Sequence, residues 1–179
     1  IIGRGIMNID KRLEQKIGFD QIRRIISDRC STAYAVERTA TETFSTNQAH
    51  IRKRLLLTDE MRLIMMFEDG FPSGGFIDCI DFLKPLERSS SAIDLLSLRK
   101  LKTMLETLRK VTSFFEGIKD GVYPNLKRMS SRILNFPEIQ RRIDGILDRY
   151  GDVKDTASDE LYSIRKSLRE KEGTISRRM

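Results

Sequence analysis

The sequence has few aromatic residues and no tryptophan. Aromatic residues make up 7% of its 179 residues, whereas 39% are hydrophobic and 33% are charged. A composition this rich in charge and poor in aromatic side chains differs from that of a typical enzyme core and is typical of helical and coiled-coil proteins. A chain of this length is still long enough to form one sizeable domain with a buried core.

Residues that bind metals or form disulfide bonds are also scarce. The two cysteines, Cys30 and Cys79, lie far apart and show no metal-binding spacing. We interpret them as free thiols of a cytoplasmic protein. His50 is the only histidine and lies in a basic run, and a lone exposed histidine is more often inert than catalytic. We therefore predict no metal site.

Motifs that bind phosphate or present a catalytic nucleophile are missing. The chain contains neither Gly-x-x-x-x-Gly-Lys-[Ser/Thr] nor Gly-x-Gly-x-x-Gly, and it has no Gly-x-Ser-x-Gly element. Gly74 and Gly75 could form a phosphate-binding nest, but a tight turn is the simpler interpretation. We predict no catalytic residue and no cofactor in this chain, and hence no enzymatic activity of its own.

Long apolar runs are absent, so we expect no transmembrane segment, which would need roughly 18 or more such residues. The segment from Ile1 to Met7 contains Arg4 and is too short for the core of a signal peptide. The chain instead has an excess of positive charge, with 33 Lys and Arg against 26 Asp and Glu and a net charge of +7. This excess permits a polyanionic partner, although a solvated cationic helix face is the commoner explanation for any single cluster.

Apolar residues at helical spacing predict an almost wholly helical, all-α fold. The strongest helix has one broad apolar face formed by Leu101, Met104, Leu105, Leu108, Val111, Phe115 and Ile118. We expect it to end at Gly121. Its start is open, and a capping-box sequence at Ser91 is one candidate.

Shorter helices are expected before and after this one, with a further one around Ala33 to Arg38. Their candidate caps or first residues are Asp10, Asp20, Asn47, Asp78, Pro124 and Pro137. The residues that we expect these helices to bury are Ile22, Ile25, Ile26, Ile51, Leu55, Met61, Ile64, Met65, Leu126, Ile133, Leu134, Ile139, Ile143, Ile146 and Leu147. Thr58-Asp59-Glu60 is interpreted as a solvated helix face.

The most informative stretch begins at Gly151, which can adopt a positive φ and suits the end of the preceding helix. Ser158 is the candidate cap of the next helix, and a capping box that starts at Thr156 is an alternative. Apolar residues then recur at spacings of three, four and seven: Leu161, Ile164, Leu168 and Ile175. We expect the first three to dock on the helix around 101–118 and the last turns to project away. We expect the helix to continue past Met179.

Four short segments carry a family resemblance. The run Gly-Asp-Val-x-Asp-x-Ala-Ser-x-Glu-Leu-x-x-Ile-Arg starts at Gly151, and three earlier segments precede it in order: Glu14 to Ile22, Thr58 to Glu60, and Gly74 to Asp78. Together they resemble the N-terminal core region of the type-two MutS proteins, paralogues linked to recombination suppression rather than to mismatch repair. The resemblance covers about residues 13–179. It also suggests Ser97 as the cap of the strongest helix.

The resemblance implies a function for a longer protein. Type-two MutS proteins are homodimeric DNA-binding ATPases that use ATP and Mg, and many end in an endonuclease domain that acts in DNA recombination or repair. A ribosome-associated role in resolving collided ribosomes also belongs to the family. By this resemblance, the chain is the helical core and the root of the lever that leads to the DNA clamp. It would transmit the ATP state to the clamp and would not itself catalyse a reaction.

The same reading divides the chain into an N-terminal extension (1–12), a helical core domain (13–157) and the start of a long lever helix (158–179). The residues predicted to contact nucleic acid lie on the last helix: Arg165, Lys166, Arg169, Lys171, Arg177 and Arg178. Two rival interpretations remain open. The chain could be a free-standing basic helical module that binds nucleic acid, or a coiled-coil assembly domain without a nucleic-acid partner.

Overall fold

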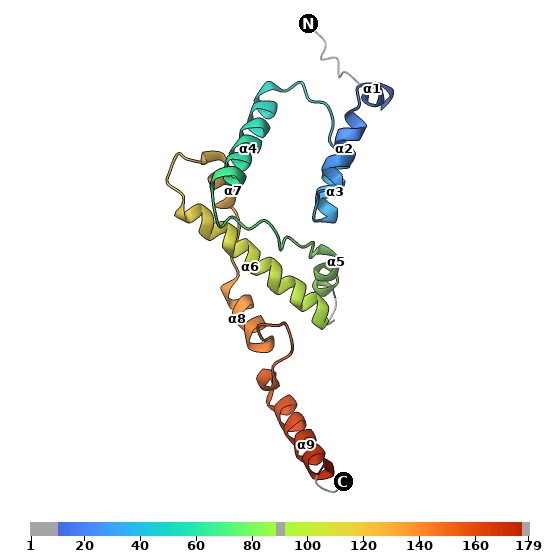
Figure 1. Ribbon diagram of the computed structural model, residues 1–179, viewed down its shortest axis with the longest axis vertical. Helices are drawn as coiled ribbons and strands as arrows, with labels where there is room; N and C mark the ends of the chain where they lie inside the picture. Colours follow the sequence, from blue (N-terminus) through green and yellow to red (C-terminus); the bar gives the residue numbers. More distant parts are fainter. Residues whose placement is uncertain (1–10, 89–91, 177–179) are drawn as a thin grey trace. The chain divides into compact units, whose positions relative to one another are not determined.

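The computed structural model describes residues 11–88 and 92–176, with side chains described for 13–88 and 92–173. In this part of the chain, all regular secondary structure is helical (Figure 1). The elements are α1 (Lys11–Lys16), α2 (Phe19–Ser27), α3 (Ala33–Ala40), α4 (Gln48–Phe67), α5 (Ile80–Leu83), η1 (Lys84–Glu87), α6 (Leu95–Gly117), α7 (Pro124–Ser130), α8 (Pro137–Ile146), η2 (Asp155–Ala157) and α9 (Asp159–Ser176). The predicted all-α fold class is confirmed.

The chain divides into two compact units. Unit 1 comprises residues 1–78 and 111–132, and unit 2 comprises residues 79–110 and 133–179. Helix α6 contributes its first part to unit 2 and its last two turns to unit 1. The division into extension, core domain and lever helix stays a prediction.

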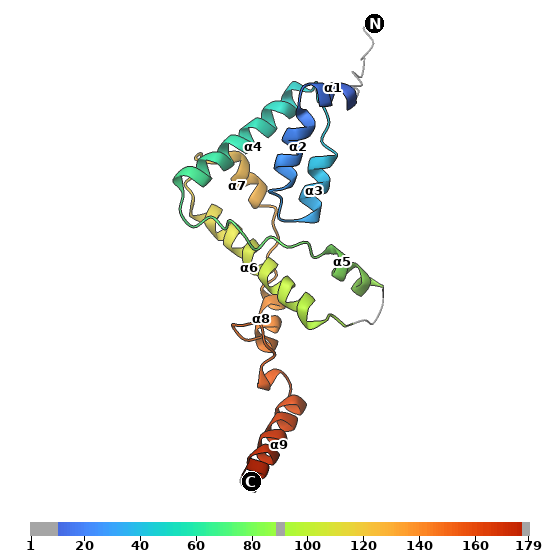
Figure 2. The same ribbon diagram turned by 45° about the vertical axis from the view of Figure 1, so that its right-hand side comes forward.

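Aromatic and aliphatic side chains from α4, α6 and α7 form the interior of unit 1. Figures 1 and 2 both show α7 beside α4, and α2 beside α3. The residues that are buried here are Ile64, Val111, Phe115, Tyr123 and Leu126. The rings of Phe71, Phe114 and Phe115 meet edge to face, with centroids 5.2–6.1 Å apart. Edge-to-face contacts of this kind add to the stabilisation from burial alone.

Glu60 is a buried polar residue that joins α4 to α7. Its carboxylate accepts hydrogen bonds from the backbone N–H groups of Asn125 (3.1 Å) and Leu126 (2.7 Å) and from the Asn125 side-chain amide (2.6 Å). Those backbone groups belong to the first turn of α7, which has no intrahelical acceptors for them. The interpretation of Thr58-Asp59-Glu60 as a solvated face is therefore wrong for Glu60, whereas Asp59 and Thr58 are exposed.

Burial was predicted correctly for only some apolar residues. Ile64, Leu126, Ile143 and Leu147 are buried, and Met61 and Ile133 are half-buried. The others are exposed, contrary to the prediction: Ile22, Ile25, Ile26, Ile51, Leu55, Met65, Leu134, Ile139 and Ile146. A helical period identifies an apolar face but not a covering element. For α2, the packing partners in unit 1 are the short helices α1 and α3, which leave much of its apolar surface uncovered.

Helix starts follow local chemistry closely. Asn47 caps α4 by accepting a hydrogen bond from the N–H of His50 (3.0 Å), and Pro124 and Pro137 are the first residues of α7 and α8. These predictions are confirmed. Asp10 lies outside the described residues.

Two other predicted caps are wrong. Gly18 precedes α2 with a φ of +74°, so Asp20 lies inside the first turn and does not cap the helix. Cys79, and not Asp78, is the residue that precedes α5.

The strongest predicted helix is α6, and its cap is Asp94. The Asp94 carboxylate accepts hydrogen bonds from the N–H (2.9 Å) and the hydroxyl (2.6 Å) of Ser97. The proposed cap at Ser97 is therefore wrong, and Ser91 lies outside the described residues. The helix ends at Gly117, one turn before the predicted Gly121. Asp94 fulfils the capping role because its side chain reaches N–H groups of the first turn that have no other acceptor.

In unit 2, the core forms where α8 packs on the first half of α6. Leu105, Ile143 and Leu147 are buried together, and Leu98, Leu101 and Val153 pack against them. Leu147 is 1% exposed and forms an isolated antiparallel bridge with Val153. This bridge closes the turn that leads from α8 to η2 and α9, and it positions the segment that carries the family resemblance.

Candidate functional site

The candidate site is the root of α9, built from the 148–153 turn, η2 and the first turns of the helix. The Asp148 carboxylate accepts hydrogen bonds from the N–H groups of Tyr150 (2.8 Å) and Asp152 (2.9 Å). The backbone bond from Asp152 is the main cause that holds the pKa of Asp148 below its usual value. Gly151 has the expected positive φ of +84°, but it lies in this turn and not at the end of α8, whose C-cap is Leu147.

Two cations of α6 hold this turn in place. The Arg99 guanidinium donates to the carbonyl oxygen of Gly151 (2.5 Å) and to the Asp152 carboxylate (2.8 Å). Lys102 donates to the carbonyl oxygen of Asp148 (3.4 Å) and forms an ion pair with Asp144 of α8 (2.9 Å). These contacts tie α6, α8 and the turn together within unit 2. Sequence reasoning missed them because their partners lie more than 40 residues apart.

A single carboxylate anchors the second and third turns of α9. Asp155 of η2 forms ion pairs with both Arg165 and Arg169, and Arg165 also donates to the carbonyl oxygen of Val153 (3.2 Å). The two arginines are four residues apart, so they lie on the same face of the helix. Their hydrogen bonds lower the pKa of Asp155 below its usual value. The helix itself begins as predicted, because the Ser158 hydroxyl accepts a hydrogen bond from the N–H of Leu161 (3.1 Å).

The six residues predicted to contact nucleic acid fall into three groups. Arg165 and Arg169 pair with Asp155 inside the unit. Lys166 and Lys171 are exposed. Arg177 and Arg178 lie outside the described residues. Nucleic-acid binding by these six stays a prediction. Among the four with described side chains, Lys166 and Lys171 are exposed, and Arg169 is exposed although it pairs with Asp155.

The apolar stripe of α9 does not dock as predicted. Leu161 is half-buried, but Ile164 and Leu168 are 51% and 53% exposed. The Ile175 side chain lies outside the described ones. The prediction that the stripe packs on the unit's own core is therefore wrong for Ile164 and Leu168. The reason is that the arginine face attaches α9 to η2, and the apolar stripe is left on the open surface.

Among the described residues, no group of three or more His, Cys, Asp or Glu is placed to hold a metal ion. In the same part of the chain, no helix is both long enough and apolar enough to cross a membrane.

Comparison with known proteins relates most of the chain to proteins that share one name. No protein-family model matches the chain. The chain is 25% identical over 173 residues to a protein of Listeria welshimeri called Endonuclease MutS2. The aligned region covers 96% of this chain and 22% of the relative. Proteins of the same name from Thermomicrobium roseum and a Geobacillus strain are 26% and 25% identical and cover 85% and 94% of this chain.

The chain spans about a fifth of the length of the curated relatives it matches, between 19% and 22%. The similarity extends far beyond the four segments from which it was first inferred. The resemblance of this chain to the type-two MutS proteins is thus confirmed over nearly its whole length.

Proposed function

We propose that this chain is the helical core and lever root of a larger MutS-like protein that binds DNA, hydrolyses ATP with Mg and cleaves DNA. In that protein the chain transmits the state of the ATP site to a DNA clamp and catalyses no step itself. Similarity over 96% of the chain to a protein called Endonuclease MutS2 supports this assignment. The proposal includes a homodimer in the cytoplasm that acts in recombination control, DNA repair or ribosome rescue.

The observation that carries the transmitting role is the anchor of α9. Asp155 binds arginines on two successive turns, and Arg99 fixes the turn just before η2. A helix has few soft degrees of freedom along its axis, since each residue is held by the hydrogen bonds of the turns around it. A helix that is fixed at its root can therefore pass a movement of unit 2 along its length.

The exposed apolar stripe suits the same role. Ile164 and Leu168 lie on a helix that is otherwise rich in charge, and a second helix with a matching seam would bury them. Lys166 and Lys171, together with Arg177 and Arg178, would add weak attraction to nucleic-acid phosphates without base specificity. We expect such binding to weaken steeply as salt concentration rises.

The test of the transmitting role uses the full-length protein. Its coding sequence should continue past Met179 and contain a Walker A motif. The variant Asp155→Asn removes the charge that both arginines share. It should leave ATP hydrolysis without DNA unchanged and reduce the effect of ATP on DNA affinity. Glu172→Gln is the matched control, because it removes an exposed acidic charge from α9, the helix that carries both arginines.

The proposal fails if the coding sequence contains no phosphate-binding loop. It also fails if ATP changes the DNA affinity of the Asp155→Asn variant as much as it changes that of the Glu172→Gln control. Nucleotide hydrolysis by the 179-residue chain alone, retained through successive purification steps, would contradict its assignment as a non-catalytic part.

A further inference from the structure

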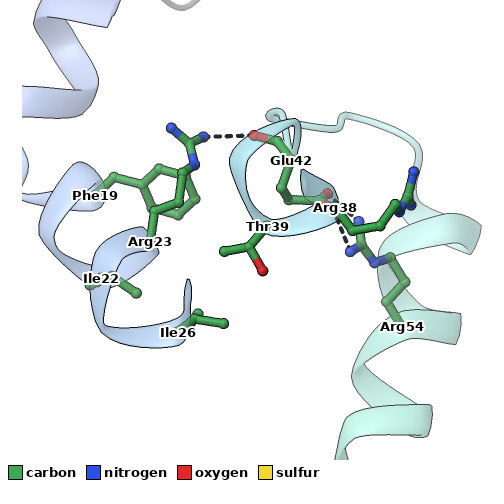
Figure 3. A pocket seen from close by; sticks show the side chains of 8 residues that line it. All are labelled: Phe19, Ile22, Arg23, Ile26, Arg38, Thr39, Glu42 and Arg54. Carbon is green, nitrogen blue, oxygen red and sulfur yellow. Dashed lines mark hydrogen bonds and ion pairs between the residues drawn. The ribbon is translucent and has the colours of Figure 1, made fainter. Parts of the chain in front are cut away.

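Unit 1 contains a pocket that the proposed transmitting role does not use. The pocket has a volume of about 220 Å³ and lies between α2, the end of α3 and α4 (Figure 3). Its volume is somewhat below the roughly 300–1,000 Å³ of drug-sized ligand pockets, so it suits a small ligand. All of its lining residues belong to unit 1, so its shape is set within one compact unit.

One side of the pocket is apolar. Phe19, Ile22 and Ile26 of α2 line it, and Figure 3 shows them on the side opposite Arg38 and Arg54. Ile22 and Ile26 are both about half exposed, at 52% and 51%. An apolar group that entered the pocket would remove part of this surface from water, which is favourable in proportion to the area covered.

Two of the three arginines at the pocket already have partners. Arg54 makes two bonds to the Glu42 carboxylate, one of them 2.6 Å long. Arg23 binds the Glu14 carboxylate (3.0 Å) and the Glu42 carbonyl oxygen (2.6 Å), and it stacks over the Phe19 ring at 4.8 Å. The Arg23 Nε is buried and has no acceptor among the described residues.

The third arginine leaves an unbalanced positive charge. Within the described residues, Arg38 forms no ion pair, and its side chain is exposed at the pocket. Glu42 is the one acidic residue that lines the pocket, and Arg54 is bonded to it. The hydrogen bond from Arg54 is the main cause that holds the pKa of Glu42 below its usual value, and the positive charges of Arg54 and Arg38 lower it further. This carboxylate is therefore ionised near neutral pH. With Glu14 neutralising Arg23 and Glu42 neutralising Arg54, the pocket retains one uncompensated cation.

We propose that this pocket binds a small amphipathic anion, with an apolar body against Phe19, Ile22 and Ile26 and an acidic group paired with Arg38. An aryl or short alkyl carboxylate has this chemistry. The planar guanidinium of Arg38 can bind a carboxylate through two parallel N–H donors. An apolar ligand without the acid would leave the charge of Arg38 uncompensated, and a simple inorganic anion would leave the apolar side empty. The proposal is independent of the role proposed for α9.

The test uses 4-phenylbutyrate as the probe and 4-phenylbutanamide as its neutral counterpart. Titration of the 179-residue chain is followed by chemical-shift changes of backbone amides in α2 and α3. We expect saturable binding of the acid with a dissociation constant around 1 mM, a strength typical of a ligand with few contacts. The neutral amide should bind about fivefold more weakly, which is the upper end of what an exposed ion pair contributes.

Three variants identify the contacts. Arg38→Gln should weaken binding of the acid about fivefold and leave binding of the neutral amide unchanged. Ile26→Asn should weaken binding of both compounds. Arg52→Gln is the control, since it removes an exposed cation of α4 that does not line the pocket. Circular dichroism of each variant checks that the helices are retained.

Two outcomes overturn the proposal. One is the absence of saturable shifts with the acid up to about 10 mM, well above the expected dissociation constant. The other is a lack of discrimination at Arg38. It would show either as equal affinities of the parent chain for the acid and the amide, or as equal affinities of Arg38→Gln and the parent chain for the acid. Either form of equal binding would mean that the compounds adsorb to apolar surface and that Arg38 recognises no anion.

Discussion

Replacing Glu60 by alanine should destabilise unit 1 strongly. The change removes the acceptor of three hydrogen bonds from Asn125 and Leu126, and the Leu126 N–H is in a buried residue. A buried donor that loses its acceptor costs about 1–3 kcal/mol. Loss of negative charge at the start of α7 removes about 0.3–1 kcal/mol more. The desolvation cost of the carboxylate, which the variant no longer bears, offsets part of this. We expect a net loss of about 2–4 kcal/mol in the free energy of unfolding.

Two further variants separate the buried carboxylate from general effects of mutation in α4. Glu60→Gln keeps one carbonyl acceptor and the shape of the side chain, so it should lose about 1–2 kcal/mol. Asp59→Ala removes an exposed carboxylate whose bond to Arg62 is 2.7 Å long, and such an exposed pair contributes under about 0.5 kcal/mol.

Urea unfolding followed by circular dichroism measures these differences, and hydrogen exchange at the Leu126 amide reports on α7 directly. The two units need not unfold together, so the exchange measurement assigns the loss to unit 1. A loss in Glu60→Ala no larger than that in Asp59→Ala would refute the reasoning. Unchanged protection of the Leu126 amide would refute it as well.

Three further predictions concern unit 2. The pKa of Asp155 lies below its ordinary 3.8 because of its two arginine partners, so its stabilising contribution is present above pH 3.8 and is lost as the pH falls through the folded-state pKa. Thermal melts of Asp155→Asn and the parent chain should therefore differ at neutral pH and converge in acid, and a difference that is the same at all pH values would contradict this. In urea unfolding, Ile164→Ala should lower the free energy of unfolding by well under about 1 kcal/mol, whereas Leu147→Ala should lower it by about 2–5 kcal/mol. Similar losses in the two variants would mean that the apolar stripe of α9 is packed. Gly151→Ala should be destabilised by about 1–2 kcal/mol, since φ is +84° and the new Cβ would lie 3.2–3.3 Å from the Arg99 side chain. The control Gly145→Ala lies inside α8, where the new Cβ meets no neighbour, so this variant should be as stable as the parent chain or more stable. Equal melting temperatures of the two variants would contradict the strain at Gly151.

Local patterns were enough to predict where four of the helices begin. Asn47, Ser158, Pro124 and Pro137 act within one helical turn of themselves, so their roles depend on neighbouring residues only. Asp94 shows the limit of the same reasoning, because Ser97, one of the two candidate caps, proved to be the donor to that cap.

Long-range partners could not be predicted in this way. Glu60 has the same sequence context as a solvated helix residue, and its acceptor role depends on donors 65 residues later in the chain. The exposure of Ile22 and Ile164 likewise depends on which element covers them, and a periodic pattern carries no information about that. At the candidate site, Asp155 belongs to the segment that suggested the family, but its two arginine partners become visible only when η2 is placed beside α9.

The internal ion pairs of unit 2 change what its positive charge can do. A cation that binds a phosphate releases the counterions condensed around a nucleic acid, and the number released sets how steeply affinity falls with salt. Arg99 already forms an ion pair with Asp152, and Arg165 and Arg169 share the single carboxylate of Asp155. They would contribute to counterion release only after breaking those pairs. The slope of affinity against salt should therefore correspond to fewer phosphate contacts than the 33 Lys and Arg of the sequence suggest, and Asp155→Asn should make that slope steeper by freeing two of them.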